Sequence, residues 1–88
     1  MLFRLALDKK FKKQLRKLDS FQANIILRWL EENIDGCENP RINGKLLAGK
    51  LAGLWRYRIG NYRVICKIQD DKLIVLAIEV GHRREIYK

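Results

Sequence analysis

Apolar and polar residues follow two different spacings along the chain, and the change of spacing marks the expected elements. Residues 2–7 alternate as in a strand, with Phe3, Leu5 and Leu7 on one side and Arg4 on the other. Beyond residue 8, apolar residues recur every three to four positions instead. The chain is therefore expected to begin with a strand that leads directly into helical structure.

Two helices are expected after this strand. Asp8 can cap a first helix, in which the apolar positions are Phe11, Leu15 and Leu18. A second, broader apolar stripe ends at Gly36, a residue suited to a helix C-terminus, and consists of Phe21, Ile25, Ile26, Trp29, Leu30 and Ile34. A tight turn near residues 19–20 joins the two. We expect an antiparallel helical hairpin that buries its stripes on one face of a sheet.

A β-hairpin is predicted around Gly60 and Asn61, which separate two runs of aromatic and β-branched residues. This turn would set Arg58 opposite Arg63. Directly paired residues share one face of a sheet, so one face would carry basic side chains, namely Arg56, Arg58, Arg63 and Lys67. Like charges that face each other are mildly destabilising, by a few tenths to about 1 kcal/mol a pair. Such a face therefore indicates an anionic partner outside the chain.

The remaining segments complete one small domain. Residues 37–53 are rich in turn-forming residues and are expected to form an ordered connection with room for one short helical turn. Residues 72–80 are so uniformly apolar that they predict a central strand, buried on both sides. The expected architecture is a single α+β domain over residues 1–88, in the order β-α-α-β-β-β. It consists of an antiparallel sheet of about four strands with the helical hairpin packed on one face.

Charge and composition narrow the function. The formal net charge is +9, from 19 Lys and Arg against 10 Asp and Glu, which favours polyanionic partners. The basic segment 9–17 is either a solvated helix face or a contact for RNA backbone, through Lys9, Lys12 and Lys13. No apolar stretch approaches the roughly 20 residues needed to cross a bilayer, and no secretory signal is evident, so a cytoplasmic protein is expected. One histidine and two scattered cysteines, Cys37 and Cys66, predict reduced thiols, no metal site and no cofactor.

Two segments resemble a known family. Residues 51–65, LAGLWRYRIGNYRVI, and residues 80–87, VGHRREIY, are similar to the RelE/ParE superfamily of bacterial toxins. The resemblance implies the RelE-like fold and a cognate antitoxin that holds the toxin inactive, with operator DNA contacted through the antitoxin complex. RelE-like members are endoribonucleases that enter the ribosomal A site and cut messenger RNA, whereas ParE-like members poison DNA gyrase.

The resemblance also implies a site. The expected catalytic residues are Arg58, Arg63, His82, Arg83 and Tyr87. The expected RNA-binding residues combine Lys45 and Arg56, at positions matched to the family, with Lys67 from the hairpin register, Arg84 beside Arg83, and the three lysines of segment 9–17. Position 45 and position 58 carry the general base in different branches of the family, and here they hold Lys45 and Arg58, so the resemblance assigns no base.

The chemistry expected at such a site is attack of a ribose 2′-OH on its own 3′-phosphate, which leaves a 2′,3′-cyclic phosphate. Arginine suits the stabilisation of the dianionic transition state, because its planar fork binds phosphate oxygens in a bidentate way and stays charged. The same permanent charge makes it a poor base, so His82 is the better proton carrier. Tyr87 can stack on a splayed base or donate its hydroxyl. The alternatives are a solvated sheet face for the arginines, a surface role for His82, a C-terminal anchor for Tyr87 and no role for Arg84. A non-catalytic module that acts only with its antitoxin on DNA is the alternative for the whole protein.

Overall fold

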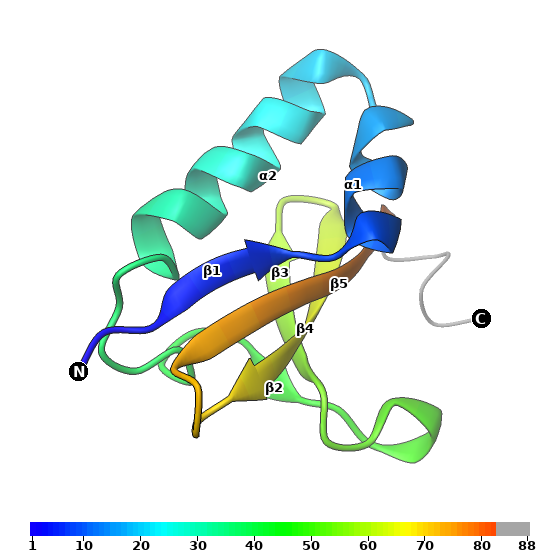
Figure 1. Cartoon of the computed structure of the whole chain (residues 1–88). Coiled ribbons are helices and arrows are strands. Elements are labelled where there is room, and N and C mark those ends of the chain that lie inside the picture. The colour runs from blue at the N-terminus through cyan, green and yellow to red at the C-terminus, as the bar shows by residue number, and fades with distance from the viewer. Residues whose placement is uncertain (83–88) are drawn as a thin grey trace.

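A computed structural model describes residues 1–82. Five strands form one sheet, and two helices cover one of its faces (Figure 1). The strands are β1 (Arg4–Leu7), β2 (Lys45–Leu46), β3 (Trp55–Ile59), β4 (Tyr62–Gln69) and β5 (Ile74–His82), in the spatial order β1-β5-β4-β3-β2. The helices are α1 (Lys9–Arg16) and α2 (Ser20–Asn33), and a 3-10 turn spans Gly49–Leu51. The expected α+β class and the helical hairpin are confirmed.

The sheet differs from the expectation in two respects. It has five strands rather than about four, because Lys45 and Leu46 pair with Arg56 and Trp55 within the segment expected to be a connection. A strand of two residues is too short to produce a recognisable alternation. The sheet is also mixed, since β1 runs parallel to β5. Alternation predicts which residues share a face, but it carries no information about the direction of strands that are distant in sequence.

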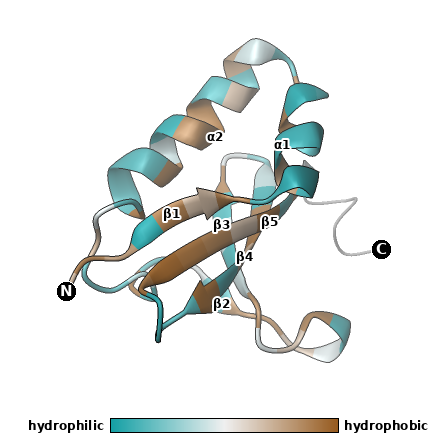
Figure 2. Cartoon of the chain, in the orientation of Figure 1, coloured by the Kyte–Doolittle hydropathy of each residue, from teal (hydrophilic) through white to brown (hydrophobic). Residues whose placement is uncertain are grey.

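The strand expected at the centre, β5, lies between β1 and β4 and is apolar along most of its length (Figure 2). Only Val75, Ala77 and Val80 are buried in it, so the expectation of burial on both sides is wrong. β1 is shorter than β5 and its register ends at Ala77. Beyond this point α1 covers the edge of β5: the side-chain oxygen of Gln14 accepts a hydrogen bond of 2.8 Å from the backbone N–H of Val80, and Lys10 pairs with Glu79 at 2.8 Å. The helix thus takes the place of a neighbouring strand at the end of β5.

The helices begin and end near the residues that the sequence indicates. The Asp8 carboxylate accepts from the backbone N–H of Lys10, and the Asp19 carboxylate accepts from that of Gln22, so both N-termini are capped. After α2, Gly36 adopts a positive φ of 80°.

One part of the second helical stripe is not buried. The row Ile26, Leu30 and Ile34 is completely enclosed, whereas Phe21 is 69% exposed and Ile25 is 41% exposed. The expectation that the whole stripe packs on the sheet is therefore wrong for these two residues. A helix that lies on one sheet buries one row of side chains fully, and a stripe as wide as this one extends past the contact.

Candidate phosphate-binding site

The predicted register of the hairpin is confirmed. Ile59 pairs with Tyr62 around the two-residue turn, Arg58 pairs with Arg63, and Arg56 pairs with Ile65. Gly60 has a φ of 60°, which the first position of such a turn requires. Alternation then directs Arg56, Arg58 and Arg63 to the sheet face that the helices leave uncovered. Arg58 is exposed, Arg56 is partly buried, and Arg63 is only 4% exposed.

A third strand adds a cation to this face. In β2, Lys45 lies directly opposite Arg56, and its side chain is exposed. On β4, Lys67 is also exposed and follows Ile65 by two positions, so it belongs to the same face. Three strands therefore present Lys45, Arg56, Arg58, Arg63 and Lys67 on one face. The sequence predicted this shared face for the four residues of β3 and β4, but it did not predict the strand β2 that adds Lys45.

The charges at the edge of this face have no acidic partner within the protein as described. Among residues 1–82, no carboxylate oxygen lies within 4 Å of the charged nitrogens of Lys45, Arg56 or Arg58. The Nε of Arg56 is buried and has no hydrogen-bond partner in this part of the chain. Arg41 shows the contrast, because both its terminal nitrogens reach the Asp70 carboxylate at 2.8 Å. Like charges that lie side by side without a counter-charge repel one another, so an anionic ligand on the accessible ends of these side chains would stabilise this arrangement.

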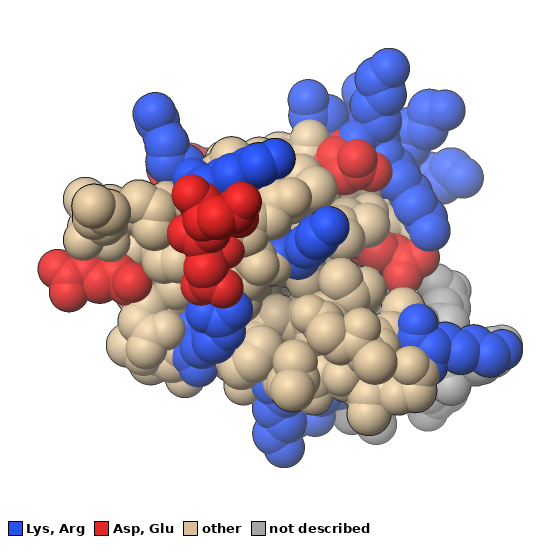
Figure 3. Space-filling view, turned by 60° about the horizontal axis from the view of Figure 1, so that its bottom comes forward, with Lys and Arg blue, Asp and Glu red and all other residues tan. Residues whose placement is uncertain are grey.

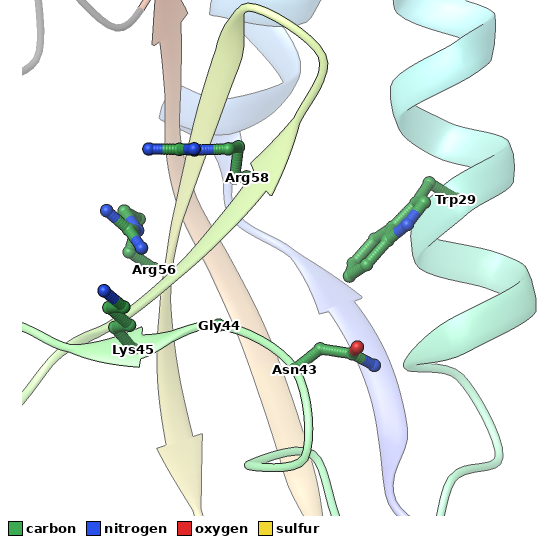
Figure 4. Close-up of a pocket in the computed structure, with 6 residues that line it drawn as sticks. All are labelled: Trp29, Asn43, Gly44, Lys45, Arg56 and Arg58. Atoms are coloured by element: carbon green, nitrogen blue, oxygen red, sulfur yellow. The ribbon is translucent and has the colours of Figure 1, made fainter.

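A hollow of about 260 Å³ lies beside these cations, at the outer edge of β3 (Figure 4). It is lined by Trp29, Asn43, Gly44, Lys45, Arg56 and Arg58. Figure 4 shows the side chains of Arg56, Arg58 and Lys45 on one side of β3 and the indole of Trp29, which comes from α2, on the other. The hollow therefore extends around the edge of the sheet.

Two aromatic residues of β3 fix the loop that borders this hollow. The buried Tyr57 hydroxyl donates to the carbonyl of Pro40 at 2.7 Å, and the Trp55 Nε1 donates to the carbonyl of Asn43 at 2.7 Å. Burial raises the pKa of Tyr57 above its usual range, so this phenol stays protonated and keeps donating. Arg41 lies 5.9 Å from the Trp55 ring centroid and adds a cation–π contact to the same loop.

His82 does not lie on the arginine face. It is the register partner of Tyr62, whereas Arg63 pairs with Gly81, and neighbouring positions of a strand point to opposite faces. Its ring contacts Tyr62 edge-on, with centroids 5.7 Å apart. The other expected residues of this segment, Arg83, Arg84 and Tyr87, lie outside the described residues.

A second basic region lies on α1. Lys9, Lys12 and Lys13 are exposed there, and basic side chains crowd one end of the molecule in Figure 3. These lysines come from the helical layer, whereas the arginines lie on the opposite face of the sheet. The two groups therefore form separate surfaces.

Trp29 and Asn43 line the hollow but were not expected at a site. Trp29 belongs to an apolar helical stripe, whose usual location is the core, and Asn43 belongs to a turn. Trp29 and Asn43 are far apart in the sequence, so no local sequence pattern indicates that they lie close together.

Neither an activated thiol nor a cluster of metal ligands is found among the described residues. Burial raises the pKa of the Cys66 thiol, and it also raises that of Cys37, so neither is activated as a nucleophile. Within residues 1–82, no three His, Cys, Asp or Glu side chains gather closely enough to hold a metal ion. No helix in this part of the chain has the length and apolar character required to cross a membrane.

Comparison with known proteins identifies the family. A family model described as the ParE toxin of the type II toxin–antitoxin system parDE matches residues 5–87. The chain belongs to this toxin family. It is 40% identical to toxin RelG of Mycobacterium tuberculosis over 54 residues, which cover 61% of this chain and 62% of RelG. The match thus spans less than two thirds of that relative.

Solved structures of the RelE/ParE superfamily share the fold. One chain of the toxin–antitoxin complex RelBE2 from M. tuberculosis superposes with a TM-score of 0.84 at 24% identity, covering 97% of this chain and 95% of that one. The isolated RelE toxin of E. coli superposes with a TM-score of 0.71 at 29% identity, covering 97% and 90%. The resemblance read from residues 51–65 and 80–87 is therefore confirmed at the level of the superfamily.

Proposed function

We propose that this toxin is a metal-independent endoribonuclease that cuts messenger RNA, in the ribosomal A site and in the cytoplasm. The observation that carries the proposal is the face on which Arg56, Arg58 and Arg63 lie together with Lys45. Guanidinium groups from adjacent strands can hold both non-bridging oxygens of one phosphodiester, whose negative charge increases as the 2′-oxygen attacks. The product would be a 2′,3′-cyclic phosphate and a free 5′-hydroxyl.

The proposed roles differ between residues. Arg58 and Arg63 hold the scissile phosphate, and Arg56, Lys45 and Lys67 extend the contact along the RNA. We assign Arg83 and Tyr87, which follow β5 in the sequence, to the same site by the family resemblance, with Arg84 as a neighbouring RNA contact.

His82 is proposed as the proton carrier, although the register directs it to the face of Tyr62. This role requires the RNA to pass around the end of β5, where His82 is the last described residue. His82→Ala and His82→Gln test it separately from the arginines: both should lower cleavage while leaving RNA affinity unchanged. Cleavage at the wild-type rate in both variants would exclude His82 and indicate that the proton is transferred by groups of the ribosome.

The α1 lysines, Lys9, Lys12 and Lys13, are proposed to contact ribosomal RNA backbone while the opposite face of the sheet holds the message. An antitoxin is the proposed protein partner, as in the RelBE2 complex, and operator DNA would be contacted through that complex. No cofactor is proposed for the reaction.

The test is primer extension on messenger RNA bound to programmed ribosomes, with wild type and Arg58→Ala. Wild type should produce new 5′ ends in the coding region, and the variant should not. Inhibition of DNA gyrase is the second candidate, because the matching family model is named for ParE. Intact transcripts together with DNA damage on expression would favour it. Unimpeded growth when the protein is expressed without an antitoxin would instead favour the non-catalytic module.

A further inference from the structure

The edge of β3 remains open beside the arginines. β2 ends at the pair between Lys45 and Arg56, so no described strand borders β3 beyond this pair on that side. In a two-residue hairpin the residues that flank the turn bond to each other, and the next pair points its backbone groups outward. The backbone N–H and C=O of Arg58 are therefore directed toward this open edge, on the side of β3 away from β4.

The two sides of the hollow differ in chemistry. On one side lie the cations Lys45, Arg56 and Arg58, and on the other lies Trp29 (Figure 4). The Trp29 ring packs against Tyr57 with centroids 5.4 Å apart and planes inclined by 50°, and the side chain is only partly buried. The core thus holds the indole in place while part of it remains available to a ligand.

Asn43 supplies a polar group close to the indole. Its backbone carbonyl is occupied by the Trp55 Nε1, but its side-chain amide is exposed and has no hydrogen-bond partner among residues 1–82. An amide that can donate and accept is the group that recognises the edge of a base.

Gly44 allows the loop to approach β3 this closely. Its φ is +84°, and a Cβ placed on it would lie 2.2 Å from the backbone oxygen of Arg56. Any other residue would have to displace the strand, and with it the cationic wall of the hollow.

These features fit a nucleotide better than other anions. A phosphate ion would use the cations alone, and an acidic protein segment would use the cations and the strand edge. A nucleotide joins an anionic phosphate to a flat base through a ribose, so it can use the cations, the indole and the amide at the same time. Aromatic side chains beside a cationic groove are the usual means of binding single-stranded nucleic acid.

We propose that the hollow at the β3 edge is a nucleotide subsite for single-stranded RNA, in which a phosphate lies on Lys45 and Arg56 and its base stacks on Trp29. Asn43 bonds to the edge of that base. The subsite deepens the proposed function, on which it rests, because it would hold a nucleotide next to the scissile phosphate.

The test compares two probes. The first is a single-stranded 2′-O-methyl RNA of mixed sequence, which cannot be cut because its 2′-oxygen is blocked. The second is inorganic polyphosphate, which has charge but no bases. We expect Trp29→Leu to weaken RNA binding about tenfold, the scale of one lost base-stacking contact, and to leave the polyphosphate affinity within about twofold of wild type.

Two further variants serve as controls. Phe21→Leu removes an exposed aromatic residue from the same helix, outside the hollow, and should leave both affinities unchanged. Trp29→Phe keeps a flat ring and should bind RNA more tightly than Trp29→Leu. Urea unfolding of each variant verifies that it is folded.

Three results would overturn the proposal. They are an unchanged RNA affinity in Trp29→Leu, an equal loss for RNA and polyphosphate, and Trp29→Phe as weak as Trp29→Leu. If Trp29→Leu binds RNA as tightly as wild type but binds poly-L-glutamate more weakly, the hollow would be assigned to an acidic protein segment. The RNA probe cannot be cut, so it measures binding separately from cleavage. If wild type binds the probe through Trp29 but cleaves no messenger RNA, the subsite is supported and only the proposed nuclease function is refuted.

Discussion

Arg58 and Arg63 lie directly opposite each other on β3 and β4, yet one side chain is exposed and the other is 4% exposed. Arg63 is also flanked by β5, where its register partner is Gly81. Arg63 therefore has a strand on each side and a register partner without a side chain, whereas Arg58 lies on β3, near the free edge of the sheet. The same residue type therefore has two environments within one site.

This difference predicts different effects of alanine substitution. Arg58→Ala should lower RNA cleavage at least about 100-fold, as expected for loss of a group that stabilises transition-state charge, and should change the free energy of unfolding by less than about 0.5 kcal/mol. Arg63→Ala should lower cleavage as much, and should also destabilise the protein by about 1–2 kcal/mol, because the buried methylenes of the side chain lose their packing.

Cleavage assays and urea unfolding of the purified variants measure both effects. Arg4→Ala, on β1, is the control for loss of an exposed arginine and should alter neither quantity. An Arg63→Ala protein as stable as wild type would contradict the structural role assigned to Arg63, and full cleavage by either variant would remove that arginine from the site.

Gly44 and Gly36 form a matched pair for a second prediction. Both have a positive φ, +84° and +80°, but a Cβ would clash with β3 only at Gly44, since nothing lies within 4 Å of it at Gly36. Gly36→Ala should cost about 1 kcal/mol, the penalty for placing alanine in the left-handed region. Gly44→Ala should cost at least about 2 kcal/mol, because the strand must also move. Equal losses in urea unfolding would show that the close approach of the loop to β3 is absent in solution.

The ion pair between Arg41 and Asp70 predicts a pH effect. The hydrogen bonds from Arg41 hold the pKa of Asp70 below its usual value. A carboxyl group with a lowered pKa in the folded state contributes stability that is fully present above its unfolded pKa, about 3.9, and that is lost as the pH falls through the folded pKa. The contribution is small because both side chains are largely exposed.

Titration of Asp70 followed by NMR measures this directly. In wild type its midpoint should lie below that of an ordinary aspartate, and in Arg41→Gln it should return upward toward that value. A midpoint for Asp70 that does not move would contradict the ion pair.

The sequence predicts local features of this protein well. The turn at Gly60 and Asn61 determines the register of the hairpin, so the shared face of Arg56, Arg58 and Arg63 follows from residue spacing alone. Helix caps and the central position of β5 are likewise encoded in short segments.

The features that the sequence does not reveal are contacts between distant segments. The pairing of Lys45 with Arg56, and the approach of Trp29 and Asn43 to the edge of β3, depend on how the helical layer and the connecting loop pack on the sheet. The face on which His82 lies depends on the register between β4 and β5. The turn that joins these strands gives no distinctive sequence signal, and their register is interrupted by an irregularity next to Ile65.

The parallel pairing of β1 with β5 has a consequence for the synthesis of this toxin. Among the five described strands, β1 is synthesised before the others and has no partner until β5, residues 74–82, has been translated, and β4 likewise lacks one neighbour until then. Pairing between such distant segments comes late in folding. A growing polypeptide that stops short of residue 74 thus lacks the strand that joins β1 to the rest of the sheet, so the complete scaffold exists only after β5 has been synthesised.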